Sequence, residues 1–180
     1  MYDEQVARAV ETFDATPFSL RVATLEDTAP ILELFDDAVA WMNSVGNTQQ
    51  WGTTPYSGDP KRVAAVALWA GSGAAVVATR DGVPVGAMAV GEATPYAPPA
   101  TEPELYVVAL VARHGSGAGR VLLGCADAIG RELGVSLLRV DCYAGGDQAL
   151  VRFYESAGYT RADTFEVKGW PGQVLERRLG

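Results

Sequence analysis

The sequence predicts an α/β fold in which helices cover both faces of a mixed central sheet. From residue 19 onward, helical and strand periodicities follow one another in the order β–α–α–β–β–β–α–β–α–β–β. A hairpin meander is followed by a strand–helix–strand unit, which requires both antiparallel and parallel neighbours in the sheet. The chain has 180 residues, 48% of them hydrophobic, which suits one compact domain with a sizeable core.

Apolar periodicity predicts the elements in order along the chain. Residues 1–18 form an N-terminal extension, in which Val6, Ala9, Val10 and Phe13 have helical spacing. The elements expected after it are strand 19–23, helices 27–44 and 59–70, strands 73–80, 83–92 and 105–111, helix 120–133, strand 135–143, helix 147–156, and strands 159–168 and 173–179.

Short local signals set several of these boundaries. Asp59-Pro60 supplies an N-cap and a proline at the first helical position. Asp81-Gly82 is a strong two-residue hairpin turn. The Trp-Pro-Gly sequence at 170–172 is predicted to connect the two closing strands as an antiparallel hairpin.

Composition excludes several classes of protein. The net charge of −8 argues against a nucleic-acid partner, which would need a basic face, and is compatible with a cationic acceptor. No apolar run is long enough for a membrane span, and the acidic N-terminus lacks a signal-peptide core, so we expect a cytoplasmic protein with no membrane partner. One histidine and two scattered cysteines form no zinc constellation, so no metal is expected.

The most informative stretch is a glycine-rich turn between a buried strand and a helix. Residues 114–119 read His-Gly-Ser-Gly-Ala-Gly. Glycines before a helix let a ligand approach the backbone and leave the first amides free to bind an anion, such as the phosphate of a cofactor. The spacing matches neither G-x-G-x-x-G nor a P-loop. A turn without any ligand is the alternative.

This turn resembles the acetyl-CoA pyrophosphate loop of the GNAT acetyltransferase superfamily, [Gln/Arg]-x-x-Gly-x-Gly/Ala, with His114 in the Gln/Arg position. A second segment, 147–159, resembles the family's Asn-x-x-Ala-x-x-x-Tyr-Glu-x-x-Gly-Phe, with Asp147 in place of Asn. Arg-x-Ala-Thr-x-x-Asp at 21–27 is similar to the usual opening of these proteins. The resemblance covers 19–179 and implies a single GNAT-like domain, 1–180, with a mostly antiparallel sheet.

The resemblance also implies a set of cofactor contacts. Amides 115–120 would face the pyrophosphate of acetyl-CoA, the cosubstrate, and strand 107–111 would supply the N–H group that stabilises the oxyanion. Tyr154 falls on the tyrosine that protonates the departing thiolate, although helical spacing alone would make it a core residue. The expected cofactor-binding residues are Val107, Ala109, Leu110, Val111, His114, Gly115, Ser116, Gly117, Ala118, Gly119, Arg120, Asp147 and Tyr154.

The general base is less clearly indicated by the sequence. Glu104, at the start of the central strand, is predicted as a catalytic residue beside Tyr154, and Tyr106 and Asp141 are further candidates. A water chain without a dedicated base is equally compatible with the sequence. Cys142 suggests a covalent acyl-enzyme only weakly, because no second histidine could activate it.

The acceptor is expected in the longest polar loop, 45–59. Gln50, Trp51 and Tyr56 are predicted to bind substrate, because amides and aromatics suit a small polar molecule. The alternative is a connecting loop with one aromatic residue packed on the core.

The expected function is direct acetyl transfer from acetyl-CoA to a primary amine of a small molecule. A protein or peptide amine, and a non-catalytic CoA-binding module, are the alternatives. We expect a monomer or a homodimer, with the N-terminal extension and the closing hairpin as candidate dimer surfaces.

Overall fold

The computed structural model describes residues 3–180 and contains one seven-stranded sheet with the order β1-β2-β3-β4-β5-β7-β6. Neighbouring strands are antiparallel except for β4 and β5, which are parallel. The predicted mixed, mostly antiparallel sheet is confirmed. The strands are β1 (Ser19–Val22), β2 (Ala75–Arg80), β3 (Val83–Gly91), β4 (Glu104–Ala112), β5 (Leu137–Tyr143), β6 (Thr160–Val167) and β7 (Trp170–Arg178).

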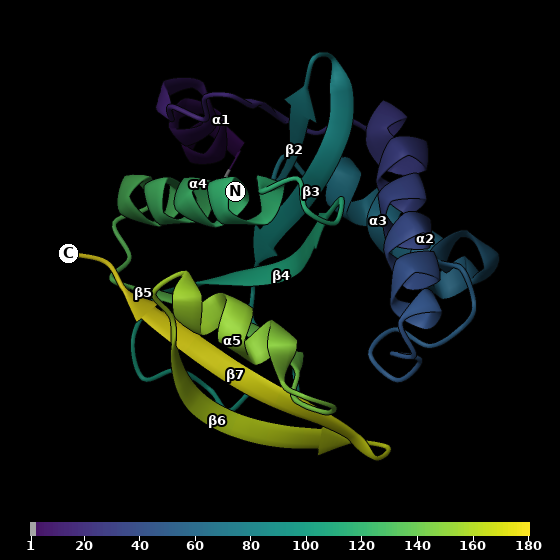
Figure 1. The fold of residues 1–180 in the computed structure, drawn as a ribbon. Coiled ribbons are helices and arrows are strands. Elements are labelled where there is room, and N and C mark those ends of the chain that lie inside the picture. Colours follow the sequence, from purple (N-terminus) through teal and green to yellow (C-terminus); the bar gives the residue numbers. More distant parts are fainter. Residues whose placement is uncertain (1–2) are drawn as a thin grey trace.

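Helices cover both faces of the sheet, as predicted (Figure 1). The α-helices are α1 (Asp3–Thr12), α2 (Thr28–Ser44), α3 (Pro60–Ala70), α4 (Ala118–Glu132) and α5 (Ala149–Ser156). Helices α1, α4 and α5 share one buried core on one face, whereas α2 and α3 build a second core on the other. Short 3-10 turns, Leu25–Asp27 and Tyr56–Gly58, precede α2 and α3.

The N-terminal extension packs on the domain in its described part. Helix α1 buries Val6, Ala9 and Val10, and Arg8 pairs with Glu132 of α4 at 2.9 Å. Residues 1–2 of the extension lie outside the described residues.

Several helices and strands begin two residues away from the predicted positions, because a glycine with a left-handed backbone conformation lies just before each of them. Gly73 has φ of +75°, so β2 begins at Ala75 and not at residue 73. Gly134 has φ of +72° and ends the turn after α4, so β5 begins at Leu137. Gly117 has φ of +80° and is the N-cap of α4, which therefore starts at Ala118 and not at residue 120.

The predicted turn at 170–172 is wrong. The closing hairpin turns at Lys168 and Gly169, both with positive φ, and 170–172 is the start of β7. Lys-Gly supplies the two left-handed positions that a tight hairpin needs. A Cβ atom at Gly172 would lie 2.2 Å from Phe165 Cζ, so this glycine serves close packing across the hairpin and not a turn.

A bulge in β4 positions the site. Ala89 of β3 pairs with Ala109, but the next residue, Val90, pairs with Val107, so Val108 is the extra residue. The bulge exchanges the two faces of the strand: Val107 lies in the core with α4, whereas Ala109 packs in the core with α2. Pairing between β4 and β5 covers only 104–107, so the two strands separate beyond the bulge.

Candidate active site

A cavity of about 900 Å³ opens where β4 and β5 separate. Its walls come from α2, loop 45–59, the β4 residues after the bulge, the glycine turn, the end of β5 and α5. Ligand pockets in proteins fall in the range of about 300–1,000 Å³. The separation of β4 and β5 after the bulge therefore leaves a cavity of ligand size beside the glycine turn.

The glycine turn forms one end of this cavity. Gly115, Gly117 and Gly119 line it, and the first two have φ of +75° and +80°. The Ser116 hydroxyl accepts a hydrogen bond from the Ala118 amide at 3.2 Å, and the Ala118 side chain is buried in the core. Neither of these two predicted cofactor-binding residues lines the cavity. The amides at the start of α4 have no intrahelical acceptor, which makes this end of the cavity suited to an anion.

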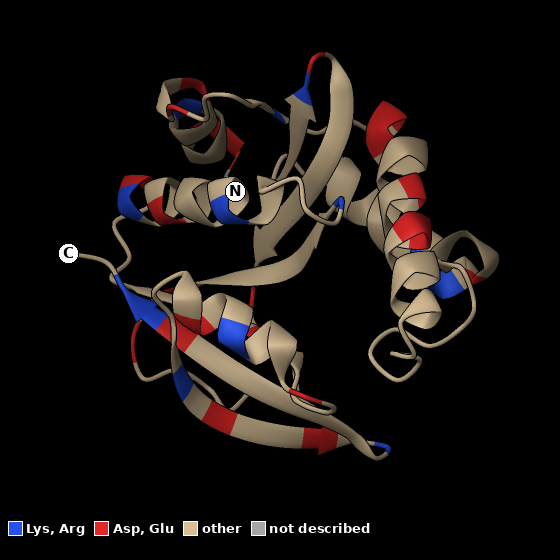
Figure 2. Cartoon of the chain, viewed as in Figure 1, with Lys and Arg blue, Asp and Glu red and all other residues tan. Residues whose placement is uncertain are grey.

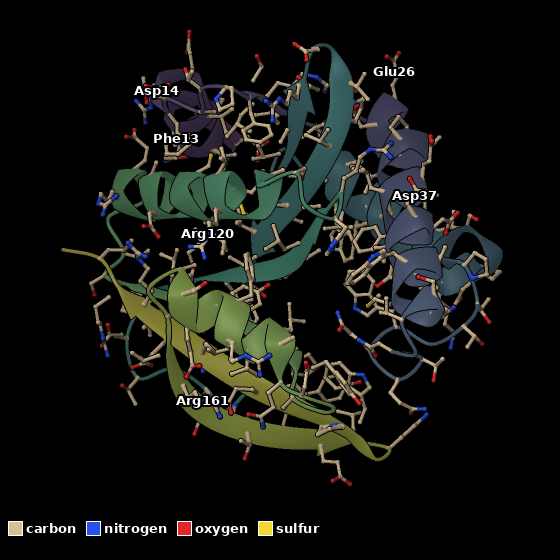
Figure 3. The ribbon with its side chains drawn as sticks, in the orientation of Figure 1. Phe13, Asp14, Glu26, Asp37, Arg120 and Arg161 are labelled. Atoms are coloured by element: carbon tan, nitrogen blue, oxygen red, sulfur yellow. The ribbon has the colours of Figure 1, made fainter. Side chains whose placement is uncertain are left out.

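Cationic side chains surround the same end. Arg120, labelled in Figure 3, reaches from α4 to α5 and donates to the Ser156 carbonyl at 3.0 Å. Arg113 forms an ion pair with Asp37 of α2 at 3.1 Å, and Figure 3 also labels Asp37. These contacts connect the glycine turn to both neighbouring helices.

His114 is exposed and stacks on Trp41, with ring centroids 3.9 Å apart and an interplanar angle of 19°. Trp41 of α2 is 42% exposed and lines the cavity. Trp41 thus fixes the orientation of His114, a pairing that no local sequence signal indicates.

The central strand presents free backbone amides to the cavity. The Arg113 amide donates to the Val85 carbonyl of β3 at 2.8 Å. Because successive amides alternate along a strand, those of Leu110 and Ala112 point away from β3, toward the gap left by β5. All four predicted residues of this strand, Val107, Ala109, Leu110 and Val111, line the cavity.

Tyr154 lines the cavity from α5 and is 4% exposed. Its ring packs edge-on against Phe153 and Tyr159, at centroid distances of 5.2 and 5.8 Å. Within residues 3–180 its hydroxyl has no hydrogen-bond partner. Burial raises the pKa of Tyr154 well above its ordinary value, so the phenol is protonated at neutral pH and available as a proton donor.

Cys142 and Asp141 follow one another on β5, and both line the cavity. Burial, together with the charge of Asp141, raises the pKa of the Cys142 thiol to about 12. The Asp141 carboxylate accepts a hydrogen bond from the Tyr106 hydroxyl at 2.6 Å, across the β4–β5 junction. Burial raises the pKa of Asp141, and the Tyr106 hydrogen bond opposes that rise.

The structure does not bring Glu104 to the cavity. Glu104 forms a two-point ion pair with Arg139 of β5, one contact of which is 2.8 Å. Arg139 is 3% exposed and also donates to the Pro98 carbonyl at 2.8 Å. Glu104 lies three residues before Val107, on the paired side of the bulge, and therefore anchors loop 93–103 through Arg139.

Asp147 also lies outside the cavity lining. Its carboxylate accepts the Ala149 amide at 3.0 Å and pairs with Arg152 at 3.5 Å, and its side chain is 80% exposed. Asp147 therefore satisfies an amide of the first turn of α5, and the structure does not place it as a cofactor contact in the cavity.

All three predicted acceptor residues line the cavity. Trp51 and Tyr56 also pack against Phe35 of α2, at centroid distances of 5.2 and 4.2 Å, so these aromatics form part of the core as well. The Gln50 carbonyl accepts the indole N–H of Trp170 at 3.0 Å. Trp170 joins the loop to the closing hairpin, and this contact was not predicted because Trp170 lies in the segment expected to be a turn.

A second cavity of about 620 Å³ adjoins the first. Its walls come chiefly from residues 92–96, which follow β3, and from β6, with Tyr96 stacked over Phe165 at a centroid distance of 6.2 Å. Gln50, Val108, Asp141 and Trp170 line both cavities.

Neither a metal cluster nor a membrane helix is found in residues 3–180. No group of three or more His, Cys, Asp or Glu side chains in that range could hold a metal ion. No helix there has the length and apolar character needed to cross a membrane. Charged residues of both signs are spread over the exposed surface, and acidic residues gather along α2 (Figure 2).

Solved structures of acetyltransferases share this fold. The putative acetyltransferase yncA of Salmonella typhimurium, solved with its cofactor acetyl-CoA, is 18% identical, with 91% of this chain and 94% of that chain covered and a TM-score of 0.59. A ribosomal-protein-alanine N-acetyltransferase from Brucella melitensis is 23% identical (89% and 99% covered, TM-score 0.63). A putative phosphinothricin N-acetyltransferase is 20% identical (91% and 99% covered, TM-score 0.64). At these identities the likeness concerns the fold alone.

The sequence itself matches a family. No curated protein is a significant match to the chain. Residues 44–159, which include loop 45–59, the central strand, the glycine turn and Tyr154, match the Acetyltransferase (GNAT) family. The protein therefore belongs to the GNAT family of acetyltransferases, and this membership supports acetyl-CoA as its cosubstrate.

Proposed function

We propose that this protein transfers the acetyl group of acetyl-CoA directly to a primary amine of a small molecule, with Tyr154 as the general acid. The observation that carries the proposal is the continuity of one cavity from the glycine turn, past the free amides of β4, to the Tyr154 hydroxyl. Anion binding, oxyanion stabilisation and proton donation are thereby available along a single path.

Each part of the reaction has a candidate group. The turn amides bind the pyrophosphate, and the Leu110 or Ala112 amide donates to the thioester oxygen as negative charge develops there. The amine nitrogen forms the new C–N bond, the C–S bond breaks, and the Tyr154 phenol gives its proton to the CoA sulfur. The phenolate then regains a proton from the nitrogen of the collapsing intermediate.

Direct transfer is favoured over an acyl-enzyme. Cys142 lines the cavity, but burial and Asp141 raise the pKa of its thiol to about 12, so it is almost entirely protonated at neutral pH. The thiolate is the reactive form of cysteine. A protonated Cys142 is therefore a poor nucleophile toward the thioester.

The walls of the acceptor region favour a small molecule. The hydrogen bond between Trp170 and the Gln50 carbonyl joins the acceptor loop to the closing hairpin, across 120 positions of sequence. Gln50 and Trp170 both line the cavity, so this contact ties two parts of its wall together. A peptide amine is the alternative, and it is included in the experiment that follows.

The test is an assay of the purified chain with acetyl-CoA and a panel of amines, with detection of free thiol. The panel contains amino acids, polyamines, arylalkylamines and short peptides. Saturable turnover with one class of small amine supports the proposal, and turnover with peptides alone supports the alternative. Tight CoA binding without turnover on any amine would identify a binding module and overturn the proposal.

Gly117 offers a test of the cofactor site. Gly117→Ala places a methyl group on a left-handed residue at the N-cap of α4, in the cavity lining. We expect the Kd for acetyl-CoA, measured by calorimetry, to rise about tenfold or more, since the left-handed backbone costs alanine ~1–2 kcal/mol and relief of this strain would displace the turn amides proposed to bind the phosphate.

Gly82→Ala is the matched control for this variant. Gly82 has φ of +77° in the β2–β3 turn, with no atom within 4 Å of an added Cβ. Both variants should lower the urea midpoint by a similar amount, but Gly82→Ala should leave the Kd unchanged. Equal Kd values in the two variants would exclude the turn from cofactor binding.

A further inference from the structure

The two cavities meet at a single ionisable side chain. Of the four residues that line both, Gln50, Val108 and Trp170 carry no charge, and Asp141 is a carboxylic acid. Asp141 lies on β5 one residue beyond the last parallel pair with β4, at the point where the strands separate. A group bound in the second cavity therefore reaches the first cavity beside Asp141.

The Asp141 carboxylate lacks a cationic partner in the described part of the chain. Its Oδ2 atom accepts the Tyr106 hydroxyl at 2.6 Å, and no other hydrogen bond or ion pair to Asp141 is present within residues 3–180. Tyr106 is fully buried, and burial raises its pKa far above the ordinary value, so it stays a donor. The Oδ1 atom remains free to accept a proton.

The surroundings of Asp141 carry few other charges. Tyr154 of α5 and Cys142 of β5 are neutral at neutral pH, because burial raises the pKa of both. In the second cavity, Glu92 adds a further acid. Arg62 lines the same cavity, but its guanidinium lies 4.2 Å from the Tyr56 ring centroid and donates to the Trp51 carbonyl at 3.1 Å.

Aromatic rings complete the second cavity. Phe165 lies between Tyr96 and Trp170, with both centroid distances 6.2 Å. Aromatic faces attract ammonium groups and also pack against apolar carbon. Two acids with an aromatic wall are suited to a cationic amine that has an apolar body.

We propose that the second cavity binds the acceptor as its ammonium ion and that Asp141, oriented by Tyr106, is the general base that removes its first proton. This assignment rests on the proposed acetyl transfer. The ammonium N–H bond breaks, its proton passes to Asp141 Oδ1, and the nitrogen lone pair then attacks the thioester carbon. Asp141 releases the proton to solvent after each turnover, which balances the conversion of an ammonium ion to an amide.

The pH profile of the Asp141→Asn variant tests this role, with the best acceptor from the panel. Wild-type kcat/KM should rise with pH as Asp141 loses its proton, at a pH above that of an ordinary aspartate, and then level off. The variant can use only the neutral amine in solution. At about pH 7 its kcat/KM should be about 10²-fold lower, and it should rise about tenfold per pH unit up to the pKa of the amine.

Two further measurements separate a chemical role from a structural one. An acceptor analogue with a weakly basic amine, which is already neutral at the assay pH, should lose far less activity in Asp141→Asn. In Tyr106→Phe the hydrogen bond that lowers the pKa of Asp141 is gone, so the acid limb should move to higher pH while the plateau rate is kept.

Asp81→Asn is the matched control, because Asp81 is exposed in the β2–β3 turn, where asparagine also tolerates positive φ. It should keep the wild-type profile. The Kd for CoA should be unchanged in all of these variants. If the wild type is active and the Asp141→Asn variant has the same pH profile, the assignment of Asp141 as the base is overturned and the proposed function is not. A wild type inactive on the whole panel overturns the proposed function and the assignment with it.

Discussion

Replacing Tyr154 with phenylalanine is expected to lower kcat by about 10²–10⁴-fold, the range usual for loss of a positioned general acid. The reason is that the CoA thiolate then leaves without a proton. The ring packing against Phe153 and Tyr159 does not involve the hydroxyl, so the fold should be preserved. The Kd for acetyl-CoA, measured by calorimetry, should change by less than about twofold.

The pH dependence of this variant adds a second readout. Burial raises the pKa of Tyr154 well above 10, so the wild-type phenol stays protonated over the whole range below that value. The kcat of the wild type should therefore not fall between neutral and mildly alkaline pH through deprotonation of Tyr154. A decline in that range that disappears in Tyr154→Phe would contradict the raised pKa.

Tyr159→Phe is the matched control for Tyr154→Phe. Tyr159 is 2% exposed, its hydroxyl is buried without a partner in the described part of the chain, and it does not line the cavity. Removing an unsatisfied buried hydroxyl should leave kcat near the wild-type value. If Tyr154→Phe and Tyr159→Phe had equal activity, Tyr154 would be a core residue and not the acid.

Replacing Glu104 with glutamine is expected to destabilise the protein by about 3 kcal/mol, because one partner of a buried ion pair is removed. Arg139 is 3% exposed, so its guanidinium would keep its charge without a counter-ion. Urea unfolding measures this loss. Arg139 also holds the Pro98 carbonyl at 2.8 Å, so the loop beside the second cavity should loosen and the KM for the acceptor should rise.

Glu102→Gln is the control for Glu104→Gln. Glu102 belongs to the same loop but forms a surface ion pair with Arg178, whose side chain is 59% exposed. Surface pairs contribute about 0–1 kcal/mol, so this variant should unfold almost as the wild type does. Glu104→Gln also tests the sequence-based prediction of Glu104 as the base. A stable variant whose low-pH limb of kcat/KM has disappeared would support Glu104 and contradict Asp141.

The local features of the site were predictable from the sequence. The glycine turn and Tyr154 each depend on residues within a few positions of one another, where helical spacing and backbone freedom are decided by the neighbours. The order of helices and strands follows from the same periodicities. The prediction of a turn at 170–172 was wrong because two neighbouring segments, Lys168-Gly169 and Trp170–Gly172, both have residues typical of turns. Only the pairing of Val167 with Trp170 shows which of the two is the turn.

The contacts between distant segments were not predictable in this way. Asp141 meets Tyr106 across 35 positions, and Trp170 meets Gln50 across 120. The register of β4 decides the first contact, and a one-residue change of register moves every side chain to the opposite face of a strand. The bulge at Val108 is such a change, and nothing in the run of apolar residues around it marks its position.

The sequence by itself therefore determined the order of elements, the glycine turn and the position of Tyr154 on its helix, because each is encoded in contiguous residues. The tertiary structure alone decided which acid faces the two cavities. Glu104 and Asp141 both flank the β4–β5 junction, yet Glu104 lies on the paired side, neutralised by Arg139, and Asp141 lies where the strands have separated. The separation leaves Asp141 without a cation and open to both cavities, which is the physical basis of its proposed role.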